Sequence, residues 1–126
     1  MQATYNSDKR KLLSCLSHGA IFFSTTLFSV GVPIVISIIS DDPVVKSNAK
    51  ESINFHFNVW FWATVIGVPI GIISWITFGI GGILFFPVVA LGFLIHWGLT
   101  IVALIHCLTN SDEPFRYPFI FRLLST

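Results

Sequence analysis

Two long stretches of the chain carry no charged residue, and a short polar segment separates them. The first stretch runs from residue 12 to 40 and the second from 52 to 111. The polar segment 41–56, which overlaps the start of the second stretch, is the only internal segment that holds charges. Charged side chains avoid the hydrocarbon interior of a bilayer and gather at its surfaces. The pattern therefore predicts an all-α, polytopic helical membrane protein whose polar segment lies at the membrane surface.

The length of each uncharged stretch predicts how often the chain crosses the membrane. Residues 12–40 would make a helix of about 44 Å, longer than a hydrocarbon core of ~30 Å, with a kink at Gly31-Val32-Pro33. Residues 52–111 are too long for one crossing, and the glycine-rich sequence 78–82 divides them. We expect a single transmembrane domain over residues 12–124, after a polar tail at 1–11. Its long spans would be 12–40, 53–77 and 83–108, and its interfacial segments would be 41–52 and 112–124.

Other topologies stay open. The sequence Gly67-Val68-Pro69-Ile70-Gly71 and the isolated Pro87 can kink the last two spans or split them. Breaks at membrane depth survive only where protein or water covers the freed backbone groups. Four shorter crossings or a re-entrant piece are therefore alternatives to three spans. With three crossings, three Lys and Arg residues would lie on the N-terminal side of the membrane and four on the other side. With four crossings, the numbers would be five and two.

The polar segment between the uncharged stretches predicts an amphipathic helix that runs into the second span. Asp42-Pro43 is a helix-start signal, and Asn48 followed by Glu51 offers a second start. At 100° per residue, five polar side chains share one face of this helix. They are Ser47, Lys50, Glu51, Asn54 and Asn58. We interpret this stripe as a polar lining or a contact with a partner; the alternative is an elbow that only orients the span.

Aromatic residues and arginines mix near the end of the chain, over residues 114–122. This segment is too short to cross a bilayer, so we expect it to lie at the membrane interface. Its rings would reach the acyl boundary while its guanidinium groups face lipid phosphates. Arg116, Tyr117 and Arg122 are the candidate interfacial anchors.

Composition excludes several classes of function. Hydrophobic residues make up 54% of the 126 positions and charged residues only 10%, against about 25% in a soluble domain. The net charge of +1 gives no nucleic-acid footprint. No carboxylate lies within the expected spans, which argues against an ion-driven pump. The four histidines lack the spacing of helical metal ligands, and no nucleophile motif occurs. We therefore expect no catalytic residue, no cofactor and no metal.

Four stretches of the sequence resemble one known family. Residues 40–46 and 49–60 look like the signature of the twenty-kilodalton Tic subunit family of the plastid import translocon, which has cyanobacterial relatives. Residues 115–124 look like its closing motif, and residues 16–20 fit its opening. The resemblance implies a helical protein with four spans, located in a plastid or cyanobacterial membrane. It also implies a central role in translocating preproteins.

These observations together predict a non-enzymatic component of a protein-translocation complex. Its partners would be membrane lipids, other translocon or membrane-complex subunits and a translocating polypeptide. The alternative is a small membrane scaffold or assembly subunit without a conducting path. A solute channel is disfavoured because the spans lack buried charges.

Overall fold

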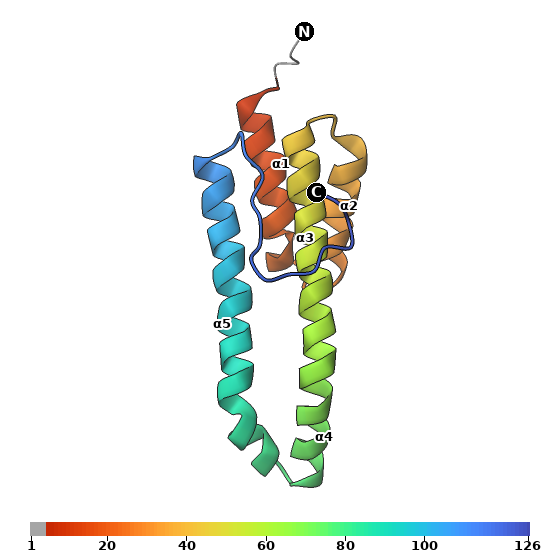
Figure 1. Ribbon diagram of the computed structural model, residues 1–126, viewed down its shortest axis with the longest axis vertical. Coiled ribbons are helices and arrows are strands. Elements are labelled where there is room, and N and C mark those ends of the chain that lie inside the picture. Colours follow the sequence, from red (N-terminus) through yellow and green to blue (C-terminus); the bar gives the residue numbers. More distant parts are fainter. Residues whose placement is uncertain (1–4) are drawn as a thin grey trace.

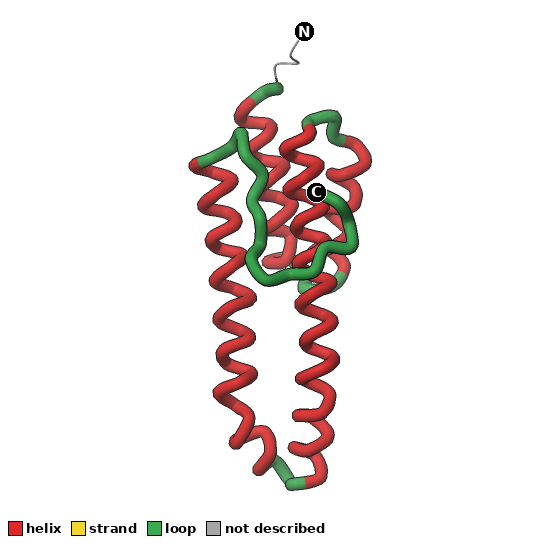
Figure 2. The backbone as a smooth tube through the Cα atoms, viewed as in Figure 1, coloured by secondary structure: helices red, strands yellow, loops and turns green. Residues whose placement is uncertain are grey.

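The computed structural model describes residues 5–126, which form helices followed by an extended C-terminal segment (Figures 1 and 2). No strand occurs among these residues, so the predicted all-α class is confirmed for them. The elements in order are α1 (Ser7–Gly19), the 3₁₀ turn η1 (Ala20–Phe22), α2 (Leu27–Ile39), α3 (Pro43–Trp62), the π-helical turn η2 (Ala63–Gly67), α4 (Val68–Ile76) and α5 (Ile80–Thr109). We call residues 110–126 the C-terminal strap.

Two helical rods dominate the molecule. Helix α3, η2 and α4 follow one another without a break and make one rod of 34 residues, while α5 has 30. Both are long and apolar enough to cross a membrane by length and composition. At 1.5 Å per residue they measure about 51 and 45 Å. They lie side by side and antiparallel along the long axis (Figure 1).

The single span expected over residues 12–40 was wrong. This stretch forms a hairpin instead, in which α1 and α2 run antiparallel beside the upper half of α3 (Figure 1). The chain reverses at residues 23–26, where the Ser24 hydroxyl accepts from the Thr26 amide at 3.3 Å. Such local side-chain bonds compete with helical ones and end a helix. Each arm has 13 residues, about 20 Å, which is too short to cross a hydrocarbon core of ~30 Å.

Helix α3 begins at the first of the two predicted starts. Asp42 is its N-cap, with Oδ1 accepting from the Val44 amide at 2.9 Å, and Pro43 opens the helix. Asn48 lies inside α3, so the alternative start there was wrong. Arg10 donates to Asp42 at 2.7 Å and so ties α1 to the same helix end. The predicted second span at 53–77 is thus the lower part of a helix that starts ten residues earlier.

The two rods join at a tight turn. Phe78 and Gly79 adopt left-handed backbone conformations with φ of 51° and 95°, and α5 starts directly afterwards. Gly81 lies so close to α4 that an added Cβ would stand 2.8 Å from Ile73 Cγ2. The turn coincides with the break predicted at 78–82. Helix α5 contains the whole of the third expected span, 83–108.

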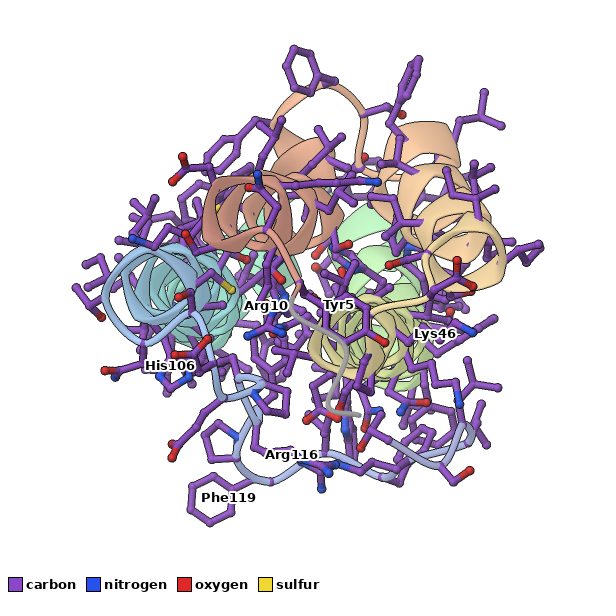
Figure 3. The ribbon with its side chains drawn as sticks, turned by 90° about the horizontal axis from the view of Figure 1, so that it is seen from above. Tyr5, Arg10, Lys46, His106, Arg116 and Phe119 are labelled. Atoms are coloured by element: carbon purple, nitrogen blue, oxygen red, sulfur yellow. The ribbon has the colours of Figure 1, made fainter. Side chains whose placement is uncertain are left out.

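The molecule has a packed half and an exposed half. Helix α1 packs against α2, α3 and α5, and the strap covers the side between α3 and α5 (Figure 3). Nearly all buried side chains lie in this upper half, whereas η2 and α4 bury none. The lower half of both rods exposes large apolar side chains almost throughout. An apolar surface of this extent marks a contact with lipid or protein.

Candidate functional site: the polar face of α3

Four polar residues form a buried row on α3, at spacings of three, three and four. They are Asn48, Glu51, Asn54 and Asn58, which we call the α3 polar ladder. Residues three and four apart are neighbours on one helical face. All four are at most 3% exposed. Because buried polar groups need partners, the contacts of the ladder define what this face does.

Asn54 and Asn58 bind the backbone of the strap. Asn54 Oδ1 accepts from the Leu123 and Leu124 amides at 3.0 and 2.9 Å, and its Nδ2 donates to the Leu124 carbonyl at 2.8 Å. Asn58 pairs in the same way with Phe121, at 3.1 and 2.7 Å. An amide side chain can match both groups of a peptide unit. The ladder therefore holds an extended chain by its backbone.

Glu51 is a fully buried carboxylate with three donors. Arg122 donates to its two oxygens at 3.0 and 2.6 Å, and the Tyr117 amide donates at 2.8 Å. The Arg116 guanidinium adds a contact at 3.8 Å. The hydrogen bond to Glu51 raises the pKa of Arg122, so the guanidinium stays charged. Bidentate pairing of this kind offsets the cost of burying charge.

Asn48 connects the ladder to α1 through His18. Its Oδ1 accepts from the Phe115 amide at 2.9 Å and lies 3.1 Å from His18 Nε2. An amide oxygen only accepts, so His18 Nε2 carries the proton and Nδ1 accepts from the Tyr117 hydroxyl at 3.0 Å. Burial lowers the pKa of His18 to about 4. The ring is therefore a neutral structural link between α1, α3 and the strap.

Tyr117 is the side chain of the strap that enters the interior. It is 1% exposed and stacks on Phe55 with ring centroids 3.9 Å apart, while Phe115 meets it edge-on at 4.9 Å. Burial raises its pKa well above the ordinary tyrosine range. The aromatic group fills the space between α3 and α5.

The structure brings most of the predicted site residues together. Glu51, Asn54 and Asn58 lie at the centre of the ladder, and Arg122 joins them. Lys50 and Arg116 stand at its edge and donate to carbonyls of Ser125 and Thr126 at 3.1 and 2.7 Å. Ser47 is half-buried beside them. The observed contacts are with the chain's own strap, so contact with a second protein or with lipid stays a prediction.

Sequence reasoning missed Asn48 and His18 as members of this site. Asn48 stands three positions before Glu51, the spacing of the ladder, but it was interpreted as a helix cap. His18 belongs to a segment expected to span the membrane. Among residues 5–126, no group of three or more His, Cys, Asp or Glu residues is placed to hold a metal ion.

The fold and site define a small all-helical protein whose two long rods meet the requirements of membrane spans. The chain belongs to the magnetosome magnetite crystal formation protein family (MamF/MmsF), whose sequence model matches residues 9–124. Comparison with curated proteins and with solved structures gives no match.

The family match corrects the resemblance to the Tic translocon subunit. The motifs that suggested it are those of the α3 polar ladder and of the strap, and they bind each other. Such motifs specify a fold, which does not by itself imply a function. The translocation role and the assignment to a plastid translocon were therefore wrong, and the cyanobacterial location and the translocon partners are not supported. The family fits the alternative of a small membrane assembly subunit better.

Proposed function

We propose that this protein is an integral membrane protein that crosses the bilayer twice. The α3–η2–α4 rod and α5 would be the spans, and the α1–α2 hairpin would enter from one side without crossing. Support comes from the exposed apolar surface of the lower half and from the lengths of the rods. Burial of that surface in hydrocarbon removes it from water at about 25 cal/mol per Å².

Charge supports one orientation for this arrangement. All seven Lys and Arg residues lie in the upper half of the molecule, in α1, the first half of α3 and the strap (Figure 1). They are Lys9, Arg10, Lys11, Lys46, Lys50, Arg116 and Arg122. Basic residues are enriched on the cytoplasmic side of membrane proteins. This half of the molecule would therefore adjoin the cytoplasm. With two crossings, Lys and Arg are distributed more unequally between the two sides of the membrane than with three or four crossings.

We further propose that the protein acts without catalysis, as a membrane assembly subunit that contributes to magnetite crystal formation. The observation that carries this proposal is the family match over residues 9–124. Its partners would be bilayer lipids and other subunits of a membrane complex. The strap rigidifies the cytoplasmic end, where such subunits would bind.

The test uses a magnetite-forming bacterium that lacks its own member of the family. Production of the wild-type chain should restore the size distribution of the crystals, measured by electron microscopy. The double variant Asn54→Leu with Asn58→Leu serves as a comparison, because it should still insert into the membrane but hold its strap less firmly. The proposal would be rejected if the wild-type chain reached the magnetosome membrane but the size distribution of the crystals stayed unrestored.

A further inference from the structure

The four tryptophans of the chain mark two levels of the molecule. Nε1 of Trp60 donates to the Thr25 carbonyl at 3.4 Å, beside the tip of the α1–α2 hairpin. The ring of Trp97 lies at the same tip, with its centroid 5.2 Å from that of Phe22. The upper level holds Trp60, Trp62 and Trp97, and Trp75 stands near the lower turn. From Trp60 to Phe78 the rod measures about 27 Å, close to a hydrocarbon core of ~30 Å. Because tryptophans gather at both membrane interfaces, the core would lie between these two levels.

The lowest part of the strap lies at the upper tryptophan level. The Phe121 ring meets Phe61 edge-on at 5.5 Å, and the Phe121 backbone pairs with Asn58. Phe119 is fully exposed, has a left-handed φ of 59° and points away from the helices (Figure 3). This backbone conformation is rare in bulky residues and often occurs at functional sites. We call Phe119 and Phe121 the aromatic tier; it stands where acyl chains would begin.

Two basic side chains lie above the aromatic tier on the same side of the molecule. Arg116 Nη1 is 3.8 Å from Glu51 Oε2, and Lys50 is the neighbour of Glu51 in α3. The two helical turns between Glu51 and Asn58 rise about 10 Å. We call Lys50 and Arg116 the basic tier. Head groups occupy the layer just outside the hydrocarbon core, and long basic side chains reach toward it. The two tiers therefore match the two parts of a phospholipid.

No side-chain carboxylate of the described residues opposes the basic tier. Glu51 is fully buried and bonds to Arg122, so its charge is compensated. The other acidic residues stand at the outer ends of α1, α3 and α5, where Arg10 binds two of them. They are Asp8, Asp41, Asp42, Asp112 and Glu113. An anionic group that approaches Lys50 and Arg116 thus meets positive charge.

We propose that this face binds an anionic phospholipid of the cytoplasmic leaflet. The lipid phosphate bonds to Lys50 and Arg116, and its acyl chains pack against Phe119 and Phe121. Basic residues near a membrane surface attract anionic lipids, and arginine pairs well with phosphate. A second copy of the chain fits less well, because a symmetric contact would bring two basic tiers together. The inference rests on the membrane placement proposed above and names the class of lipid.

The first experiment uses the full chain in nanodiscs of equal parts phosphatidylglycerol and phosphatidylcholine. Native mass spectrometry measures the ratio of the two lipids that stay bound. We expect at least about tenfold enrichment of phosphatidylglycerol, since each basic residue near the surface contributes about fivefold. Lys50→Gln with Arg116→Gln should bring the ratio close to one. The matched control, Lys9→Gln with Lys11→Gln, removes the same charge from α1 and should keep the enrichment.

A second experiment tests the depth of the aromatic tier. Phe119→Trp adds a fluorophore, and phosphatidylcholine brominated along its chains quenches tryptophans that it touches. The fluorescence gained over wild type should be quenched more by bromines near the head group than by bromines near the chain end. Ser125→Trp, at the height of the basic tier, should be quenched less than Phe119→Trp. Absence of quenching at position 119 would place this side chain in water or against another protein, and the proposal would be wrong.

The outcomes separate this inference from the membrane placement. A chain that alkaline carbonate extracts from membranes would overturn both. A chain that resists extraction but binds the two lipids equally would overturn the lipid preference alone. Equal losses of enrichment in the two Lys and Arg double variants would show that net charge, rather than this face, selects the lipid, and would also overturn it.

Discussion

Glu51 places a carboxylate in the interior of the packed half, and Arg122 is the side chain that compensates for its burial. The carboxylate is fully buried, and the Arg122 side chain is 34% exposed. Removing one partner of such a pair leaves a charge without compensation. The pair also fixes the strap, because the Tyr117 amide shares the same carboxylate.

We predict that Glu51→Gln lowers the free energy of unfolding by about 2 kcal/mol. The variant keeps an acceptor for the Tyr117 amide but leaves Arg122 without its counter-charge. Chemical unfolding in detergent measures the loss. Lys50→Gln, on the same helix, should cost under about 0.5 kcal/mol. A double-mutant cycle with Arg122→Gln should show a coupling of about 1 kcal/mol; additive losses would disprove the pairing.

His18 makes stability depend on pH. Its pKa of about 4 in the folded chain lies below the ordinary 6.5, so the unfolded chain binds a proton first as pH falls. The stabilisation is complete above pH 6.5 and is lost as pH falls from 6.5 toward 4, by about 3 kcal/mol at most. Unfolding at pH 7.5 and 4.5 should therefore show a steeper loss for wild type than for His18→Gln. Glutamine can serve Asn48 and Tyr117 without titrating, so equal slopes would contradict the prediction.

Among the elements, the ladder of α3 and the strap behave as a receptor and its bound peptide. We predict that Asn54→Leu with Asn58→Leu frees the strap while the helices persist. The amides of Phe121, Leu123 and Leu124 should exchange with solvent at least about tenfold faster, because they lose their acceptors. Hydrogen–deuterium exchange with mass spectrometry measures this. Ser47→Leu, half-buried on the same helix, is the control, and an unchanged exchange rate in the double variant would refute the prediction.

The turn between the rods depends on a close approach at Gly81. An added Cβ would stand 2.8 Å from Ile73 Cγ2 and 3.0 Å from the Ser74 backbone nitrogen. We predict that Gly81→Val lowers the unfolding temperature, at a cost of about 1–3 kcal/mol. Gly71→Ala meets nothing within 4 Å and should be neutral or stabilising, since alanine favours helix. Thermal unfolding, monitored by circular dichroism, compares the two variants. Similar midpoints would show that Gly81 approaches α4 less closely than described.

For the whole molecule, the two crossings proposed above would place both ends on one side of the membrane. We predict that cysteines at Asp8→Cys and Ser125→Cys react with an impermeant maleimide from the same side, and that Phe78→Cys reacts only from the other. Cys15 and Cys107 are both free thiols, so these variants are made in a chain in which both are replaced by serine. The physical reason is that a half-length hairpin returns the chain to its side of entry. Labelling of Asp8→Cys and Ser125→Cys from opposite sides would support three crossings instead.

The sequence by itself determined the local features of this protein. Uncharged stretches predicted the helical class, and Asp42-Pro43 was one of two predicted starts of α3 and the one that the structure uses, because a cap depends on neighbouring residues. The glycine-rich turn and the polar face of α3 followed from residue type and helical period. Each of these depends on contacts within a few positions of the chain.

Only the tertiary structure decided what those features meet. Residues 12–40 have the hydropathy of a span, but packing of α1 and α2 against α3 made them a hairpin. The polar face of α3 suggested a pore or a partner, yet its partners are amides and an arginine 63 to 71 positions away. Hydropathy and periodicity carry no information about contacts at that separation. Packing of the strap between α3 and α5 satisfies these buried polar groups.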